Sequence, residues 1–156
     1  MKALIVNDTA MKISEKFLKD SLKKISSSLE KKNIVDKVLF DKELTLVFLD
    51  KLAAKKLNWQ YRQKDYPTDI LSFESGDPES LGELVFCPEV LETQAKEHKQ
   101  SFDHELGLML LHGVLHLLGF DHEDGGDEEK KMMSLQDEVF KELFKAKTKA
   151  KAKTGK

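Results

Sequence analysis

The chain has 156 residues with a formal net charge of −2, and 40% of them are hydrophobic while 35% are charged. That length fits one domain with a substantial core and is too short for two, so we expect a single folded unit with a heavily charged surface. No apolar run approaches the length of a membrane span, and Asp8 interrupts the apolar start, which argues against a signal peptide. A single cysteine, Cys87, excludes an internal disulfide, so we expect a cytoplasmic protein without a membrane partner.

Charge is unevenly distributed along the chain. The last 12 residues, from Lys145 to Lys156, contain six lysines and no acid, and without them the rest of the chain carries −8. Because lysine alternates there with alanine and threonine and no apolar stripe appears, we predict one domain over residues 1–144 and a flexible lysine-rich tail over 145–156. Such a tail either adds salt-dependent affinity for polyanions or only improves solubility, and the sequence does not decide between these roles.

Two strands separated by a helix are expected at the start of the chain. Residues 3–6 read as a strand, and residues 44–49 are almost continuously apolar, as expected for a strand that is covered on both faces. Between them, apolar residues recur at helical spacing over 13–29, and Asp8 and Thr9 are the capping candidates.

A short helix, a loop and a hairpin are expected next. Asp50 can cap a helix that Asn58 ends. Residues 58–69 then form a polar loop that contains several aromatic side chains. Two short strands, 70–73 and 84–86, flank a turn-rich segment and should pair as an antiparallel hairpin.

Three helices are expected to complete the chain. Pro88 suits the first turn of a helix that ends near His98, a second helix is expected over 102–118, and Asp127 begins the third. The second of these is apolar nearly all round in its C-terminal part, so it must be central and buried. The order β-α-β-α-β-β-α-α-α predicts an α+β fold, in which about five helices pack on a mixed, mostly parallel sheet of about four strands with one antiparallel strand.

A histidine motif in the predicted central helix carries the strongest chemical signal. His112 and His116 are four residues apart, so on a helix their imidazoles share one face. Gly119 is free to adopt a positive φ, which would end the helix and bring His122 back as a third nitrogen donor. Three neutral imidazoles that leave a fourth position open are typical of a catalytic zinc site. The spacing also resembles that of zinc peptidases, except that Gly113 stands where those enzymes carry the glutamate base.

The remaining histidines and the cysteine are expected to have ordinary roles. His98 and His104 lie among charged residues, so we expect solvated or capping side chains. Cys87 precedes a proline at an expected strand end and has no basic neighbour to lower its pKa, so a buried or capping role is expected.

Arg62 is the second chemical feature, because it is the only arginine among 26 basic residues. A guanidinium binds phosphate or carboxylate through two parallel hydrogen bonds and stays charged in any environment. The alternative is a surface arginine stacked on Trp59 or Tyr61, and the composition alone does not decide between the two roles.

Three segments together resemble a known family. In chain order they are Leu57-Asn-x-x-Tyr61-Arg62-x-Lys64-Asp65-x-Pro67-Thr68-Asp69-Ile-Leu-Ser72-Phe73, Leu81-Gly82-Glu83-Leu84-Val85 and His112-Gly-x-Leu-His-Leu-x-Gly-x-Asp-His122. They resemble the YbeY family, bacterial endoribonucleases implicated in the maturation and quality control of ribosomal RNA. Two positions depart from the family pattern, since Glu74 replaces a frequent proline and Glu83 a frequent aspartate.

The resemblance implies a function and a set of site residues. It implies one zinc ion held by His112, His116 and His122, with Arg62 as the residue most closely tied to activity. It implies a zinc-dependent endoribonuclease that is specific for single-stranded RNA and acts in ribosomal RNA processing, including maturation of the 16S rRNA 3′ end and ribosome quality control. The expected partners are ribosomal RNA precursors and the ribosome or its proteins.

A hydrolytic mechanism follows as a hypothesis. The metal would activate water or polarise a phosphoryl oxygen, and Arg62 would stabilise the charge that grows on the non-bridging oxygens. The proton acceptor stays open between metal hydroxide, the ribose 2′-hydroxyl and Asp121, although Asp121 more readily serves as a hydrogen-bond acceptor for a ligand histidine. Trp59, Tyr61 and Tyr66 either stack on unpaired bases or belong to the core of the loop.

Two other functions are compatible with parts of the sequence. A zinc metallopeptidase is favoured by the histidine spacing and disfavoured by Gly113. A non-catalytic, ribosome-associated binding protein would carry a structural or vestigial zinc. Three ligands argue against a structural site, which normally has four.

Overall fold

The computed structural model describes residues 1–33, 35–120 and 126–154. In chain order the elements are β1 (Lys2–Asp8), α1 (Glu15–Lys32), the 3-10 helix η1 (Lys37–Asp41), β2 (Glu43–Leu49), α2 (Lys51–Arg62), β3 (Ile70–Glu74), β4 (Ser80–Phe86), α3 (Pro88–Glu97), α4 (Phe102–Leu117) and α5 (Asp127–Thr154). The predicted order of strands and α-helices is confirmed, and only η1 has no counterpart among the expected elements.

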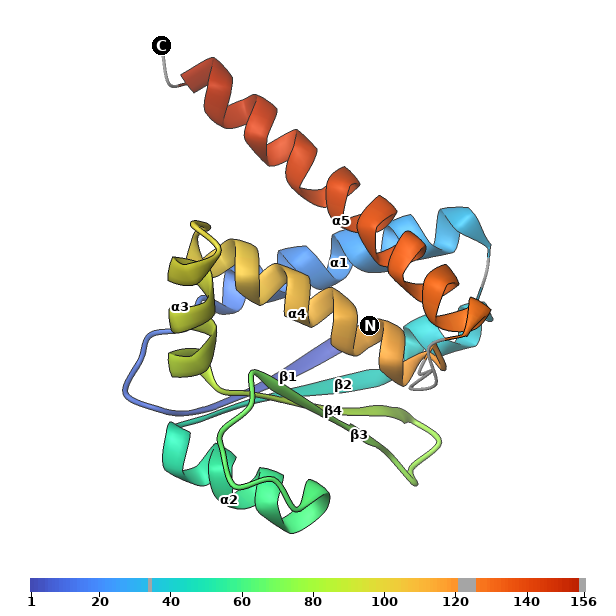
Figure 1. The fold of residues 1–156 in the computed structure, drawn as a ribbon. Helices are drawn as coiled ribbons and strands as arrows, with labels where there is room; N and C mark the ends of the chain where they lie inside the picture. The colour runs from blue at the N-terminus through green and yellow to red at the C-terminus, as the bar shows by residue number, and fades with distance from the viewer. Residues whose placement is uncertain (34, 121–125, 155–156) are drawn as a thin grey trace.

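The four strands form one sheet in the order β1-β2-β4-β3 (Figure 1). β1 pairs parallel with β2 and β2 parallel with β4, whereas β3 pairs antiparallel with β4. The parallel pairs are joined through helices, and the antiparallel pair is the predicted hairpin. The predicted α+β class with a mostly parallel sheet is therefore confirmed.

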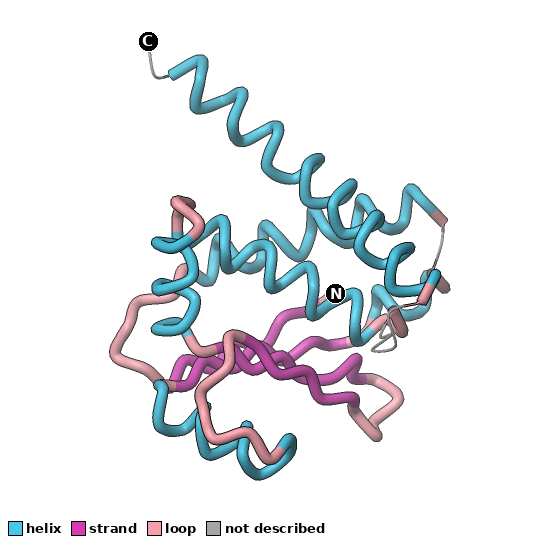
Figure 2. Tube along the Cα trace, in the orientation of Figure 1, coloured by secondary structure: helices cyan, strands magenta, loops and turns pink. Residues whose placement is uncertain are grey.

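Helices lie on both faces of the sheet. α1, α3, α4 and α5 lie on one face and α2 lies on the other, as Figures 1 and 2 show. The core between α1, α4 and the sheet consists of fully buried apolar side chains, among them Leu18, Ile25, Leu46, Phe48, Leu84, Leu110 and Val114. Burial of this apolar surface is the main force that holds the helices on the sheet.

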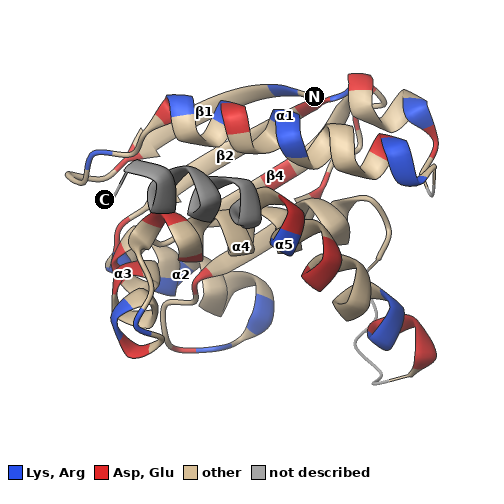
Figure 3. Cartoon of the chain, turned by 90° about the horizontal axis from the view of Figure 1, so that it is seen from above, with Lys and Arg blue, Asp and Glu red and all other residues tan. Residues whose placement is uncertain are grey.

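α4 lies in the middle of the helical layer, as predicted. Seen from above in Figure 3, it is almost free of charged residues, whereas α1 and the described part of α5 carry many. Its side chains Leu106, Leu110, Leu111, Val114 and Leu115 are at most 1% exposed. A helix that is apolar nearly all round needs neighbours on several sides, and here β3, β4, α1, α3 and α5 supply them.

Two helix boundaries differ from the prediction. α1 is capped by Ser14, whose Oγ accepts a hydrogen bond from Phe17 N, and not by Asp8 or Thr9, because β1 extends through Asp8. α2 continues past Asn58, which is fully buried and donates from Nδ2 to the carbonyl of Tyr66. Because this buried contact from Nδ2 holds the side chain, the weak helix preference of asparagine no longer decides where the helix ends.

The C-terminal segment continues directly from the packed part of α5. α5 runs as a helix to Thr154, so residues 145–154 have the regular backbone of a helix. Alanine and lysine are both strong helix formers, and a helix that has already begun extends at little cost. The division into a domain and a tail at residue 144 stays a prediction. No helix within the described ranges is long and apolar enough to cross a membrane.

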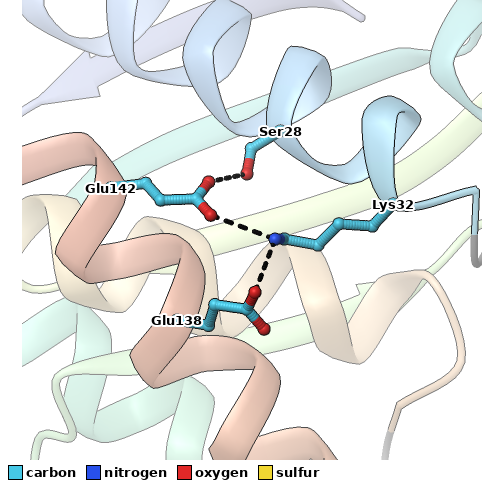
Figure 4. Close-up of polar contacts among 4 residues, drawn as sticks. All are labelled: Ser28, Lys32, Glu138 and Glu142. Atoms are coloured by element: carbon cyan, nitrogen blue, oxygen red, sulfur yellow. Dashed lines mark hydrogen bonds and ion pairs between the residues drawn. The ribbon is translucent and has the colours of Figure 1, made fainter.

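A polar cluster fixes α5 against α1 (Figure 4). Lys32 donates from Nζ to Glu138 at 2.9 Å and to Glu142 at 3.0 Å, while Ser28 Oγ donates to Glu142 at 2.6 Å. The hydrogen bonds from Ser28 and Lys32 lower the pKa of Glu142, and those to Glu138 and Glu142 raise the pKa of Lys32. Because both glutamates lie one turn apart on α5 and bind one lysine, the cluster sets the position of α5 along its neighbour.

Candidate active site

The structure places two of the three predicted metal ligands on one face of α4. Ser101 caps the helix by accepting a hydrogen bond from His104 N, and the helix runs without a break through His112 and His116. Gly119 follows with φ +103°, the predicted left-handed turn after the helix. His122 lies outside the described residues, as does Asp121.

The imidazoles of His112 and His116 face each other. Their Nε2 atoms are 2.9 Å apart, and their ring centroids are 4.3 Å apart. Two nitrogens that bind one tetrahedral zinc at about 2.0–2.1 Å would themselves be about 3.3 Å apart. The rings would therefore need to separate by only a few tenths of an ångström to share an ion.

Gln136 on α5 supports the first of these rings. His112 Nδ1 lies 2.8 Å from Gln136 Oε1, and the Gln136 side chain is 5% exposed. Sequence analysis overlooked this residue, although a signal was present. Gln136 lies four residues after Met132 and three before Val139, so it interrupts the buried apolar stripe of α5 with a polar group.

Arg62 reaches the same pocket from the other side of the sheet. The pocket has a volume of about 390 Å³ and is lined by Arg62, Thr68, Asp69, Ile70, Leu71, Ser72, His112 and His116. Arg62 is the last residue of α2, and Gln63 turns the chain with φ 56° immediately after it. The two imidazoles and the guanidinium, which are far apart in the sequence, thus line one cavity.

Asp69 contributes the only carboxylate among the described lining residues. Its Oδ1 accepts hydrogen bonds from Ile70 N at 2.8 Å and from Thr68 Oγ1 at 3.2 Å. The backbone carbonyl of Asp69 accepts a bond from Cys87 N, which ties this end of β3 to β4. The sequence contained Asp69 in the segment before β3, but it did not reveal that this carboxylate and His112 line the same pocket.

Comparisons with known proteins identify the family. The family model described as endoribonuclease YbeY matches residues 4–144. An endoribonuclease YbeY from Bdellovibrio bacteriovorus is 49% identical over 145 residues, which are 93% of this chain and 97% of that protein. Another from Aquifex aeolicus is 42% identical over 67% of this chain and 72% of its own length.

The chain belongs to the YbeY endoribonuclease family. It is therefore an enzyme that hydrolyses RNA, and RNA is its substrate. A protein from Thermotoga maritima solved in solution has the same fold, with a TM-score of 0.66 and 27% identity over 95% of this chain and 93% of that one.

Gly113 marks a difference between this YbeY-family pocket and that of a zinc peptidase. A Cβ atom at Gly113 would lie 2.7 Å from Ile70 Cδ1 and 2.7 Å from Leu84 Cδ2. The position therefore faces the sheet, and hydrophobic side chains of β3 and β4 close it. A glutamate base has no space there, so a general base has to come from another residue.

The aromatic residues near Arg62 are surface residues. Trp59, Tyr61 and Tyr66 are 56%, 57% and 51% exposed, which contradicts the alternative that they form the core of a loop. The Tyr61 ring meets the Phe73 ring edge to face, with centroids 5.0 Å apart. Tyr61 and Phe73 each follow or precede a lining residue in the chain, Arg62 or Ser72, although neither ring lines the pocket itself.

The two remaining histidines differ in outcome. The side chain of His98 is 60% exposed and His98 is the C-cap residue of α3, which agrees with the expected solvated or capping role. His98 Nδ1 lies 2.6 Å from Oε1 of Glu105, which is 2% exposed, and this hydrogen bond raises the pKa of His98. The His104 ring packs edge to face on Phe140 with centroids 4.8 Å apart, and it is half-buried rather than solvated.

Cys87 is buried, as predicted, and burial raises the pKa of its thiol, which is unfavourable for a nucleophile.

No group of three histidine, cysteine, aspartate or glutamate side chains within residues 1–33, 35–120 and 126–154 gathers closely enough to hold a metal ion. Of the three proposed ligands, His112 and His116 lie in these ranges. His122 lies outside them, in the segment 121–125. The pair His112 and His116 fits a metal by the chemistry and the direction of its donors.

Proposed function

We propose that this chain is a zinc-dependent endoribonuclease that cuts single-stranded RNA during the processing of ribosomal RNA. One observation carries the proposal beyond family membership. Arg62 lines the same pocket as His112 and His116, whose Nε2 atoms point toward each other. One small cavity thus combines a guanidinium that can bind phosphate oxygens with two nitrogens that can bind a metal ion. Phosphodiester hydrolysis by a metal-dependent enzyme uses both.

His112, His116 and His122 would hold the ion, and the donor set is the one that catalytic zinc prefers. When bound, zinc supplies Lewis-acid chemistry at a phosphoryl oxygen and makes water a better nucleophile at neutral pH. The contact from Gln136 supports the fit, because it places the His112 proton on Nδ1 and leaves the Nε2 lone pair directed at the site.

Arg62 would bind the non-bridging oxygens of the scissile phosphate. Its position at the end of α2 leaves the guanidinium exposed toward RNA, yet the residue lines the pocket. Two parallel N–H donors orient the phosphate and stabilise the negative charge that develops on it.

Proton transfer needs an acceptor, since Gly113 leaves no room for a base on α4. Asp69 joins Asp121 and the ribose 2′-hydroxyl as a candidate, because its carboxylate lines the pocket. Oδ1 of Asp69 already accepts two hydrogen bonds, so Oδ2 is the oxygen that would take the proton.

The preference for single strands would come from Tyr61. Its exposed ring, next to Arg62 in the chain, offers a face on which an unpaired base stacks, whereas bases inside a duplex are not accessible to it. The ribosomal target, including the 16S rRNA 3′ end, and the ribosome as partner rest on the family resemblance of the three sequence segments.

The decisive experiment combines metal analysis with cleavage. Purified protein should contain zinc, cut single-stranded precursor ribosomal RNA, lose that activity on chelation and regain it with zinc. Cleavage that persists after complete removal of metal would contradict zinc dependence. Cleavage of unstructured peptides with RNA left intact would favour a peptidase, and binding of ribosomes without any cleavage would favour a non-catalytic module.

A further inference from the structure

We propose that Gln136 is a positioning residue for the metal site, because it selects the tautomer in which Nε2 of His112 is free to bind zinc. This inference rests on the proposed function, since it assumes that His112 is a metal ligand. It assigns a role to a residue of α5, a helix that supplies none of the predicted ligands.

The tautomer of His112 depends on which ring nitrogen carries the proton. A neutral imidazole carries one N–H, on either Nδ1 or Nε2, and only the other nitrogen has a lone pair for a metal. Gln136 Oε1 lies 2.8 Å from His112 Nδ1 and can only accept, so Nδ1 must donate. The lone pair of His112 is then on Nε2, the atom that faces His116 at 2.9 Å.

Burial strengthens this preference. Gln136 is 5% exposed, so little water competes for its carbonyl oxygen. Were the tautomer reversed, the Nδ1 lone pair would face the oxygen of Gln136 without a proton between them. A buried acceptor that loses its donor is costly, and this cost favours the Nδ1–H form.

The packing of α5 holds Gln136 in place. Met132 and Val139, on the same face of the helix, are buried in the core, and Glu138 and Glu142 bind Lys32 of α1. These contacts lie on both sides of Gln136 along the helix. The amide is therefore held by a helix that is itself fixed to α1, which limits the rotation available to the His112 ring.

Two substitutions at the same position separate the hydrogen bond from the packing. Gln136→Glu keeps an oxygen acceptor, whereas Gln136→Met has a similar size and cannot accept a comparable bond. Glu138→Gln is the matched control, because it removes one of the two ion pairs with Lys32, keeps the other at Glu142 to hold α5, and leaves the amide of Gln136 intact.

The first readout is the ¹⁵N spectrum of the imidazoles in metal-free protein, at a pH above the range in which imidazole is protonated. His112 should be the Nδ1–H tautomer in the unmodified protein, in Gln136→Glu and in Glu138→Gln, and should shift toward Nε2–H in Gln136→Met. A predominantly Nε2–H His112 in the unmodified protein would overturn the proposal.

The second readout is zinc affinity, measured by competition with a chelator. Gln136→Met should bind zinc roughly 10- to 100-fold more weakly, with Gln136→Glu and Glu138→Gln close to the unmodified protein. Equal zinc affinity in Gln136→Met would refute the role of Gln136. If Gln136→Met does not fold, Gln136→Glu provides the test. Because Gln136→Glu retains the acceptor, a loss of zinc affinity in this variant would also refute the role of Gln136.

These readouts are independent of RNA cleavage. Failure of the unmodified protein to cut RNA would refute the proposed function while the tautomer of His112 could still be measured. Normal cleavage and normal zinc binding in Gln136→Met would refute the present inference and leave the proposed function intact.

Discussion

The two sides of the pocket are built differently. On one side, His112 and His116 project from a buried helix, and a buried amide contacts the first ring. On the other side, Arg62 and Tyr61 lie at the exposed end of α2, next to a loop and the edge strand β3. The histidine side, which would be the metal side, is thus built on a buried helix, whereas the side of Arg62 and Tyr61, which would meet RNA, is open to solvent.

This difference suggests a division of labour. Metal ligands need fixed geometry, because small displacements change coordination, and a core helix provides that rigidity. A long polyanionic substrate needs accessible cations and aromatic faces, which a surface helix end provides. Substitutions on the two sides should therefore fail in different ways, and this expectation can be tested.

The largest effect is expected at the metal side. His116→Ala should abolish RNA cleavage and weaken zinc binding by more than the roughly 100-fold that loss of a supporting partner costs. Zinc content and cleavage of a single-stranded RNA are the measurements. His98→Ala, a histidine substitution away from the pocket, is the control and should retain both properties. Normal zinc content in His116→Ala would remove this residue from the ligand set.

Arg62→Ala should lose activity without losing metal. Removal of one donor for transition-state charge costs roughly 100- to 1000-fold in rate. Zinc should stay bound, because the hydrogen bond that positions His112 comes from Gln136 and not from Arg62. Single-turnover cleavage and zinc content should be measured together. Arg62→Lys should recover only part of the rate, since an ammonium lacks the planar fork. If Lys64→Ala, a change of a nearby exposed cation, reduced the rate equally, general attraction of RNA would explain the effect better.

Tyr61→Ala should weaken RNA binding and leave the chemical step nearly unchanged. Loss of one base–aromatic stack corresponds to about 1–3 kcal/mol, or roughly 5- to 150-fold in affinity. The loss of affinity is measured as the change in Kd of a short single-stranded RNA for the metal-free protein. Trp59→Ala is the matched control for the loss of an exposed aromatic side chain, because Trp59 is similarly exposed on the same helix. Equal losses in both variants would argue against a specific role for Tyr61.

The smallest effect is expected far from the pocket, in the pair of His98 and Glu105. Because the pKa of His98 is raised in the folded state, the pair stabilises the fold fully below the unfolded pKa of about 6.5. That contribution is lost as the pH rises through the higher folded value.

Thermal unfolding at one pH below and one pH above the two pKa values of His98 tests this pH dependence of stability. His98→Asn should lower Tm at about pH 6 and have much less effect at about pH 9. Lys96→Gln, which removes the exposed ion pair with Glu92, should show no such dependence between these two pH values. A loss of Tm in His98→Asn that is equal at both values would mean that packing, not charge, explains the contribution of His98.

Patterns of hydrophobicity were sufficient to predict most of the fold. β2 is a continuous apolar run because both of its faces are covered by other elements. α1 has apolar residues at helical spacing because only one of its faces packs on the core. In both elements the pattern of apolar residues indicates which faces are covered. The boundary of α2 was wrong because Asn58 is buried and bonded to Tyr66, a contact between residues whose pairing no local pattern encodes.

Within the site, the histidine spacing predicted a convergence that His112 and His116 display, and the conformation of Gly119 was also predicted correctly. The roles of Arg62 and the three histidines stay predictions until metal and activity are measured. Gln136 was missed because its partner, His112, is far away in the sequence. Asp69 was missed because only the fold brings its carboxylate to the pocket that His112 lines.

The sequence by itself determined the fold class and the helix that carries two histidines, because these depend on periodicity and spacing within short segments. The family follows from the resemblance of three sequence segments and from the comparisons with known proteins. Only the tertiary structure decided that Arg62 shares a pocket with the histidines, that Gln136 supports one of them and that Gly113 faces a closed sheet. Those facts depend on which surfaces of separate elements pack together, and packing is settled by the whole chain at once.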